Sequence, residues 1–333
     1  MIPACYFGNS DHGIRCELCP RACVISEGNS GFCGAYAVHN GILYAVRFGK
    51  IVGMAVDPIE KKPLYHFYPG SSILSVAQHG CNLRCVWCQN HHLSAGMEPI
   101  DTPVVDTGSL VRYCVDNGHH MIAFTYSEPI IWYEYIREFS EQVKQTIPGF
   151  SVVLVSNGYI SEQPLRNLIP FIDAVNLDIK TMSDASYRTF TGGTLQPVLR
   201  TAKIIAESSV HLEITNLIVT GINDNSEEIS ELARWIADEC GNHIPLHISR
   251  YHTAYKCKAP DTPLITIENA WEIARKTLHY VYTGNVTQGH ADTVCRACGS
   301  IIISRTGYSI NTSGLAGSDC KQCGSKLYGR FVQ

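Results

Sequence analysis

The chain has 333 residues, of which 45% are hydrophobic and 17% charged, and its formal charge at pH 7 is −4. This length can bury a sizeable core, as one large domain with appendages or as two modest domains. The acidic balance argues against a broad nucleic-acid-binding face, which is normally basic. There is no apolar run long enough to span a bilayer and no N-terminal signal pattern. The sequence therefore predicts a soluble, cytoplasmic protein without a membrane partner.

Fifteen cysteines in such a chain need a chemical explanation. Without a secretion signal, metal ligation accounts for them better than disulfides do. Eleven fall into three groups: Cys16, Cys19, Cys23 and Cys33; Cys81, Cys85 and Cys88; and Cys295, Cys298, Cys320 and Cys323. The other four are isolated and are expected to be small buried hydrophobic residues.

The N-terminal region, residues 1–70, contains the segment CELCPRACVISEGNSGFCG, with the spacing C-x2-C-x3-C-x9-C. Four thiols close a tetrahedral site, so the pattern favours a structural zinc. A fully ligated iron–sulfur cluster uses the same number of thiolates and stays open as a second interpretation. Beyond these cysteines, residues 42–48 and 51–55 alternate in polarity and predict a β-hairpin that turns at Gly49 and Lys50.

From residue 72 onward, strand-like and helix-like segments alternate. The predicted strands are residues 72–78, 121–125, 152–156, 174–179, 210–219, 245–249 and 280–283. The predicted helices are residues 107–117, 130–145, 162–168, 195–207, 226–239 and 267–277. This alternation indicates βαβ units and a parallel sheet in an α/β fold. About six units fit an open or incomplete (β/α) barrel, although a doubly wound sheet has the same local pattern.

Polar residues follow each of the first six strands, where parallel sheets carry their chemistry. They include Ser127 and Glu128 after the second strand, Asn157 after the third, and Asp178 and Lys180 after the fourth. Residues near the sixth strand form a candidate substrate-facing group: His247, Arg250, Tyr251 and His252. Any one of these could be a cap, a turn residue or a surface charge. As a set they predict a functional site at this edge of the sheet.

The first strand runs into Cys81-Asn-Leu-Arg-Cys85-Val-Trp-Cys88, a C-x3-C-x2-C motif. Three closely spaced thiolates suit a [4Fe–4S] cube, in which each sulfur reaches a different iron. The fourth iron then has no protein ligand and can bind a small molecule, as the open position of catalytic zinc does. The alternatives are zinc with a fourth ligand from His79, His91 or His92, and thiols that bind no metal.

The C-terminal region, residues 289–333, carries two C-x2-C-G motifs separated by 21 residues. Each motif turns tightly enough for two thiolates to face one ion, so Cys295, Cys298, Cys320 and Cys323 predict a zinc ribbon. A rubredoxin-like iron site has the same ligands. Nucleic-acid binding is unlikely for this module because it carries few basic residues.

The loop motif, with Trp87 just before the last cysteine, resembles the cluster loop of radical S-adenosylmethionine (SAM) enzymes. The resemblance implies a partial (β/α)6-type barrel over residues 71–288, with the open iron binding SAM. Reductive cleavage of SAM would give methionine and a 5′-deoxyadenosyl radical that abstracts hydrogen from a substrate. The substrate does not follow from the resemblance.

The same resemblance implies the SAM contacts. Glu128 occupies the place of the Glu in the family's Gly-Gly-Glu-like motif, with Ser127 in place of a glycine. Asp178 and Lys180 resemble the Asp-x-Lys motif of glycyl-radical-enzyme activases, near the methionyl end of SAM. Asn157 and Asn216 are expected at the ribose or carboxylate, and Trp87 at the adenine edge.

Motifs along nearly the whole chain resemble the radical SAM component of the AmmeMemoRadiSam system, which is similar to pyruvate formate-lyase activating enzyme. They include the N-terminal cysteine segment, Asp57-Pro-Ile-Glu-Lys-Lys-Pro63 and the terminal ribbon. The resemblance implies Memo-like and AMME-candidate-like partners, together with an electron donor that reduces the cluster. Two alternative hypotheses are a glycyl-radical-enzyme activase and a non-enzymatic metal-binding interaction module.

Overall fold

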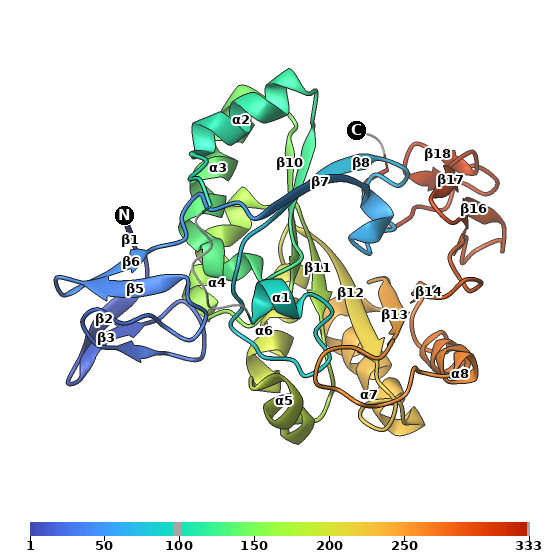
Figure 1. Ribbon diagram of the computed structural model, residues 1–333. Coiled ribbons are helices and arrows are strands. Elements are labelled where there is room, and N and C mark those ends of the chain that lie inside the picture. The colour runs from blue at the N-terminus through green and yellow to red at the C-terminus, as the bar shows by residue number, and fades with distance from the viewer. Residues whose placement is uncertain (96–101, 332–333) are drawn as a thin grey trace.

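The computed structural model describes residues 1–95 and 102–331, and at its centre lies an eight-stranded sheet (Figure 1). The strands are β7 (Gly53–Pro58), β8 (Ser72–Ala77), β9 (Met121–Phe124), β10 (Ser151–Ser156), β11 (Ala174–Asp178), β12 (His211–Ile218), β13 (Leu246–Arg250) and β14 (Val281–Gly284). Strands β8 to β14 are parallel, and β7 pairs antiparallel with β8. The predicted α/β fold with a mostly parallel sheet is confirmed.

The strands lie in the sheet in their order along the chain, from β7 at one edge to β14 at the other. A doubly wound sheet would reverse its order at a switch point, and this sheet does not. The choice that periodicity left open is therefore settled in favour of an open, incomplete barrel. The helices are α1 (His91–Ser94), α2 (Thr107–Asp116), α3 (Tyr133–Thr146), α4 (Glu162–Leu168), α5 (Asp184–Thr191), α6 (Leu195–Ala206), α7 (Ser226–Ile236) and α8 (Leu264–Ala274).

Local sequence explains these elements. The central strands β9 and β10 are mostly apolar and almost wholly buried, as in a parallel sheet covered by helices. Helix α3 buries Ile136, Phe139 and Val143, which recur at helical spacing on one face. Helix α7 begins after Asn225, whose side chain accepts a hydrogen bond from the backbone N–H of Glu228 at 2.8 Å. None of the helices in the described part of the chain is long and apolar enough to cross a bilayer.

The N-terminal module consists of two small antiparallel sheets. One contains β1 (Ile2–Pro3), β5 (Tyr36–His39) and β6 (Ile42–Ala45), and the other β2 (Phe7–Ser10), β3 (Gly13–Cys16) and β4 (Val24–Ile25). Its apolar residues Ile14, Leu18 and Ile25 belong to the same buried cluster as barrel residues such as Ile131. The module therefore shares a core with the barrel.

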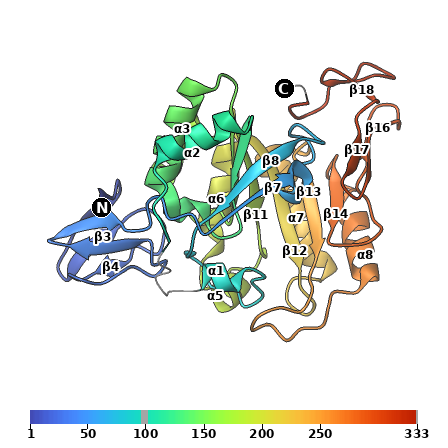
Figure 2. The ribbon, with the colours of Figure 1, turned by 45° about the horizontal axis from the view of Figure 1, so that its top comes forward.

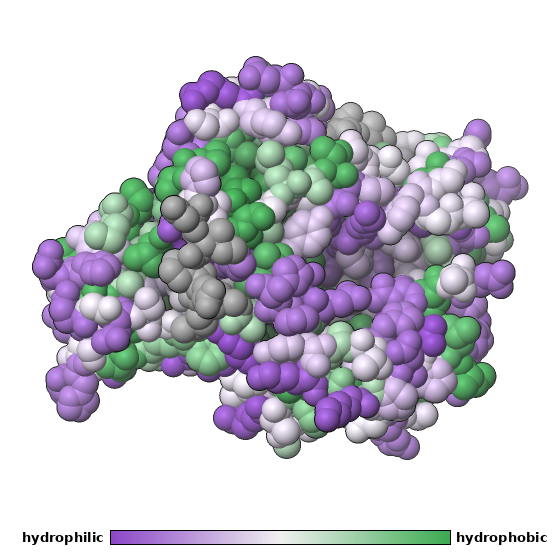
Figure 3. All heavy atoms as spheres, in the orientation of Figure 1, coloured by the Kyte–Doolittle hydropathy of each residue, from purple (hydrophilic) through white to green (hydrophobic). Residues whose placement is uncertain are grey.

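The predicted hairpin at residues 42–55 is wrong. Strand β6 pairs with β1 and β5, whereas β7 pairs with β8 over six residues. Both segments contain strands, but each strand pairs with strands elsewhere in the chain. The local alternation of polar and apolar residues does not show which strands will pair. Residues 53–58, which fall within the predicted module of residues 1–70, thus extend the central sheet. The apolar side chains of Met54 and Val56 are exposed on this edge strand, and Figure 3 shows hydrophobic surface gathered beside it.

The C-terminal module consists of β15 (Thr293–Val294), β16 (Ile301–Thr306), β17 (Ser309–Asn311), β18 (Leu315–Ala316) and β19 (Asp319–Cys320). It has a small core of its own around Ile302, Ile303 and Leu327. The two cysteine-rich modules lie at opposite ends of the central sheet in both views (Figures 1 and 2).

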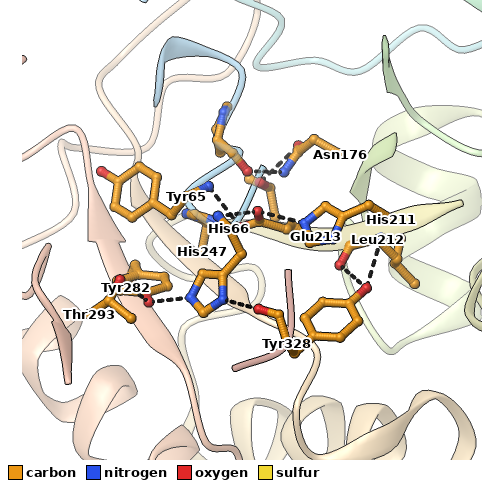
Figure 4. A network of polar contacts seen from close by, with 12 residues as sticks. Tyr65, His66, Asn176, His211, Leu212, Glu213, His247, Tyr282, Thr293 and Tyr328 are labelled. Carbon is orange, nitrogen blue, oxygen red and sulfur yellow. Dashed lines mark hydrogen bonds and ion pairs between the residues drawn. The ribbon is translucent and has the colours of Figure 1, made fainter. Parts of the chain in front are cut away.

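A buried carboxylate on β12 holds several segments together beneath the open edge of the barrel (Figure 4). Glu213 has no exposed surface and accepts hydrogen bonds from the backbone N–H groups of Tyr65 (3.0 Å) and His66 (2.7 Å). Its oxygens also lie 3.0 Å from Nε2 of His211 and 2.6 Å from Nε2 of His247. Burial alone would raise the pKa of Glu213, but the two histidines lower it well below its usual range.

The network continues from His66 into the C-terminal module. His66 Nε2 lies 2.6 Å from the Tyr282 hydroxyl, which lies 2.9 Å from Oγ1 of Thr293. His66 Nδ1 lies 2.6 Å from the carbonyl oxygen of Tyr328. Residues 65–66, the edge strand β14 and the C-terminal module are thereby joined through one buried polar cluster.

Replacing this carboxylate should destabilise the protein strongly. Glu213→Gln removes the charge that the two histidines and two N–H groups face, so we expect a loss of about 3–5 kcal/mol in the free energy of unfolding. The measurement is the urea midpoint of anaerobically handled protein. Because the pKa of Glu213 is lowered by folding, its contribution is present above pH 4 and is lost progressively as pH falls below that.

The matched control is Glu162→Gln, which removes an exposed ion pair with Arg166 within one helix. It should change stability by no more than about 0.5 kcal/mol. Equal changes in the free energy of unfolding for the two variants would contradict the role of Glu213 in holding these segments together.

Candidate active site

A cavity of about 330 Å³ opens at the carboxyl ends of the parallel strands. Residues that follow β8, β9, β10, β11 and β13 all contribute to its lining, as the positions of the polar residues predicted. The predicted site residues that line it are Cys81, Cys85, Cys88, Trp87, Ser127, Glu128, Asn157, Asp178, Lys180, Arg250, Tyr251 and His252. The fold thus brings twelve predicted side chains to one place.

The loop with three cysteines is held from both sides. The backbone N–H groups of Arg84 and Val86 donate to the carbonyl oxygens of Thr191 (2.8 Å) and Phe190 (3.0 Å) at the end of α5. On the other side, Nη1 of Arg84 donates to the carbonyl oxygen of Cys81 at 2.6 Å, and Nη2 donates to that of Phe32 at 2.9 Å. Backbone and arginine hydrogen bonds therefore support the conformation of this loop from both sides.

The three thiols are close neighbours but do not converge on a point. Burial is the largest cause that raises the pKa of Cys85 to about 12 and that of Cys81 well above its usual range, and charge on the other thiols raises both further. Among the described residues, these three sulfurs do not form a group within 4.8 Å of one another. In a cube each thiolate binds a different iron, so such spacing fits a cluster better than a single ion.

Zinc at this loop would need a fourth ligand beside the three thiols. No described histidine forms a close ligand group with these thiols. Nδ1 of His79 lies 3.2 Å from the carbonyl oxygen of Leu93, and the ring of His91 stacks on Tyr255 with centroids 4.5 Å apart.

Glu128 is buried beside the cysteine loop and accepts three hydrogen bonds. The donors are Oγ of Ser156 (2.7 Å) and the backbone N–H groups of Asn157 (2.9 Å) and Ile130 (3.1 Å). Burial outweighs these contacts and raises the pKa of Glu128 to about 7. The carboxyl group can therefore change its charge near neutral pH.

An ion pair and an amide lie on the other side of the cavity. Nζ of Lys180 lies 2.6 Å from Oδ2 of Asp178, and although burial opposes the charge, Asp178 and Cys85 raise the pKa of Lys180 above its usual range. Nδ2 of Asn157 donates to Oδ1 of Asn82 at 2.9 Å and lies 3.6 Å from Sγ of Cys81.

Two predicted residues lie away from the cavity lining. His247 is in the Glu213 network described above, and Asn216 donates to the carbonyl oxygen of Ile179 at 2.7 Å. After β13, Nε of Arg250 donates to the carbonyl oxygen of Thr262 at 2.6 Å, and Nδ1 of His252 lies 2.7 Å from Asp261. Arg250 and His252 line the cavity while held by these contacts.

Lys62, for which the sequence motifs predicted no site role, also lines the cavity. Its Nζ lies 2.8 Å from Oδ2 of Asp57 and 4.5 Å from the ring centroid of Tyr126. Asp57 also accepts hydrogen bonds from Tyr126 and from Ser75. The consecutive lysines Lys61 and Lys62 shortly after Asp57 were a visible signal in the sequence. Only the pairing of β7 with β8 places this group at the cavity.

The C-terminal thiols converge tightly. The four sulfur atoms of Cys295, Cys298, Cys320 and Cys323 lie within 4.8 Å of one another. The Sγ atoms of Cys295 and Cys323 are 3.6 Å apart, and those of Cys298 and Cys320 are 3.8 Å apart. Contacts with Ser300 lower the pKa of Cys298 to about 6, which favours the thiolate that metals bind. This group could hold one metal ion.

Comparison with known proteins identifies the family. A profile of the radical SAM superfamily matches residues 75–236. A protein of Methanocaldococcus jannaschii, itself described as uncharacterized, is 39% identical over 325 residues, which cover 95% of this chain and 96% of that protein. The chain belongs to the radical SAM superfamily. It is therefore an enzyme of this class, and the hypothesis of a non-enzymatic interaction module is wrong.

Other relatives agree with this membership. The pyruvate formate-lyase-activating enzyme of Staphylococcus epidermidis is 23% identical over 193 residues, covering 55% of this chain and 76% of that enzyme. The crystal structure of a radical SAM methyltransferase from Sphaerobacter thermophilus shares the fold, with a TM-score of 0.52 and 14% identity over 68% of this chain and 71% of that one. Membership implies SAM and a [4Fe–4S] cluster as cofactors.

Proposed function

We propose that Cys81, Cys85 and Cys88 hold a [4Fe–4S] cluster and that the adjoining cavity binds SAM. The bound group supplies reductive cleavage of SAM to methionine and a 5′-deoxyadenosyl radical, which abstracts hydrogen from a substrate. One observation carries the proposal: three neighbouring, partly buried thiols line a cavity that no other described cysteine lines. Three ligands for four irons leave one iron free to bind SAM.

The chain's own residues would orient SAM in this cavity. Glu128 accepts from the SAM amino group, and the Asp178–Lys180 pair lies at the methionyl end. Trp87, which is nearly buried against Phe190 and lines the cavity, covers the adenine edge. The side-chain amide of Asn157 lies beside the thiol of Cys81 and would help to position this cluster ligand.

Reconstituted protein should cleave SAM. After anaerobic loading with iron and sulfide, dithionite-reduced protein is expected to form 5′-deoxyadenosine and methionine, measured by chromatography. Cys85→Ala should lower the rate by at least about a thousandfold, because a cluster without one corner ligand no longer holds SAM in place. Cys240→Ala, at an isolated cysteine far along the chain, is the matched control and should keep the activity. Absence of cleavage by fully loaded wild-type protein would disprove the proposal.

SAM affinity should depend on the charge of Glu128. As pH rises from 6 to 8 through its pKa of about 7, the carboxylate forms and SAM binding should tighten. Glu128→Gln should weaken binding about tenfold to a hundredfold at pH 8, the equivalent of about 1.5–3 kcal/mol for a charged hydrogen bond. The loss should be smaller at pH 6. Equilibrium binding to cluster-loaded protein measures this, with Glu162→Gln as the control, and equal losses at both pH values would contradict the role.

The C-terminal thiols are proposed to hold structural zinc in a ribbon. Tetrahedral zinc with Zn–S bonds of about 2.3 Å needs sulfurs about 3.8 Å apart, close to the separations of 3.6 and 3.8 Å found here. Cys320→Ala should remove about one zinc per chain in metal analysis and lower the melting temperature, because structural metal binding is coupled to folding. Iron in place of zinc, or loss of SAM cleavage from a stable variant, would instead indicate a redox site.

The biological setting is proposed from the sequence motifs. The N-terminal cysteine segment, the Asp57–Pro63 stretch and the terminal ribbon support an AmmeMemoRadiSam-type system with Memo-like and AMME-candidate-like partners and an electron donor. A glycyl-radical activase is the second candidate, favoured by relatives named as activating enzymes for pyruvate formate-lyase and isethionate sulfite-lyase. A glycyl radical signal on a partner, formed only with this enzyme and SAM, would select the second candidate.

A further inference from the structure

We propose that the four N-terminal thiols bind a second [4Fe–4S] cluster, not zinc, and that it exchanges electrons with the cluster at the active site. The four are Cys16, Cys19, Cys23 and Cys33. The electron exchange rests on the proposed function, whereas the presence of the second cluster does not.

The four thiols surround one small cavity in the N-terminal module. Its remaining lining is largely apolar and includes Leu18, Ile25, Phe32 and Tyr36. Cys16 is buried, and Cys19, Cys23 and Cys33 are partly buried. The sulfurs therefore face a common, largely dry space, which is what a bound inorganic group requires.

The spacing of the sulfurs distinguishes a cluster from a single ion. Around zinc, four sulfurs lie about 3.8 Å apart, whereas thiolates on different corners of an iron–sulfur cube lie about 6 Å apart. Within the described chain, the C-terminal thiols meet the closer spacing, with all four sulfurs inside 4.8 Å, and the N-terminal thiols do not. The N-terminal group shares its wider spacing with the thiols of the active-site loop. The two sites have the same number of cysteine ligands, but the distances between their sulfur atoms differ.

Positive charge surrounds the N-terminal site. Arg21 lines the cavity. On either side of Cys33, Nε of Arg47 donates to the carbonyl oxygen of Gly34 at 2.8 Å, and Nη2 of Arg84 donates to that of Phe32 at 2.9 Å. Three guanidinium groups compensate the negative charge of a tetrathiolate cluster and favour its acceptance of an electron.

The N-terminal cysteine loop is in direct contact with the active-site loop. A Cβ on Gly80 would lie 2.3 Å from the carbonyl oxygen of Cys33, so only glycine allows this approach. Arg84 donates to the carbonyl oxygens of both Cys81 and Phe32. Nε of Arg21 donates to the carbonyl oxygen of Asn82 at 2.5 Å.

A short polar path joins one sulfur of each group. Asn82 lines the N-terminal cavity together with Cys19. Asn157 then connects Oδ1 of Asn82, at 2.9 Å, to Sγ of Cys81, at 3.6 Å. Two asparagine side chains thus separate ligands of the two proposed clusters. In the transfer, the N-terminal cluster takes one electron from a low-potential one-electron reductant and passes it to the active-site cluster, with no bond made or broken.

Metal content tests the second cluster without using activity. Anaerobically reconstituted full-length protein should contain about eight irons and eight sulfides per chain, as two cubes require. The variant Cys81→Ala/Cys85→Ala/Cys88→Ala should keep about four irons and show the electron paramagnetic resonance signal of a reduced [4Fe–4S] cluster. A variant with no iron and two zincs per chain would overturn the proposal. If that variant does not fold, four irons in place of eight in the wild type overturns it equally.

Electron counting tests the exchange. Wild-type protein is reduced with dithionite, freed of the reductant and mixed with SAM. Each cleavage consumes one electron, so two connected clusters should yield up to about two 5′-deoxyadenosines per chain. Cys19→Ala/Cys23→Ala, which removes two proposed ligands of the second cluster, should yield about one. A yield of one from wild type whose second cluster stays reduced would disprove the exchange. No cleavage by protein with eight irons would disprove the proposed function but leave the second cluster standing.

Discussion

The close approach of Gly80 to the carbonyl oxygen of Cys33 is the contact on which the arrangement of the site depends. It allows the loop after β8 to lie against the N-terminal module, where Arg84 bonds carbonyl oxygens of both loops. The far side of the same loop is fixed to the end of α5. The loop that carries the thiols of residues 81–88 is therefore held by two neighbouring parts of the structure, and such support lowers the ordering cost of a binding site.

Depth within the barrel decides which polar residues reach the cavity. Alternate residues of a strand share a face, so Glu213 and Thr215 of β12 point to the same side, as do His247 and Ser249 of β13. Thr215 and Ser249 line the cavity, whereas Glu213 and His247, two residues earlier, form the buried network below it. The barrel interior thus has two layers: the residues that line the cavity, and below them the buried hydrogen-bond network around Glu213. Asn216 points to the other face and bonds Ile179.

The order of strands and helices could be predicted from sequence because each segment carries its own periodicity. The polar residues after the strands could also be grouped, since parallel strands end at one edge. Three features needed the structure. Strand β7 joins the main sheet through pairing with β8, which no local pattern encodes, and it brings Lys62 to the cavity. The depth of His247 follows from strand register. The spacing of cysteines in the sequence gives the number of ligands. It does not give the distances between sulfur atoms, which distinguish a site for one ion from a site for a cubic cluster.

The two four-cysteine sites also differ in how they connect to the cavity. The C-terminal site sits in a module with its own core, joined to the barrel through His66, Tyr282 and Thr293 around the Glu213 network. That network is closed by its own hydrogen bonds, which agrees with the structural role proposed for this site. The N-terminal site shares the barrel core and reaches Cys81 through two asparagines. The N-terminal cysteine loop directly contacts the active-site loop, and this is the arrangement that the proposed electron exchange requires.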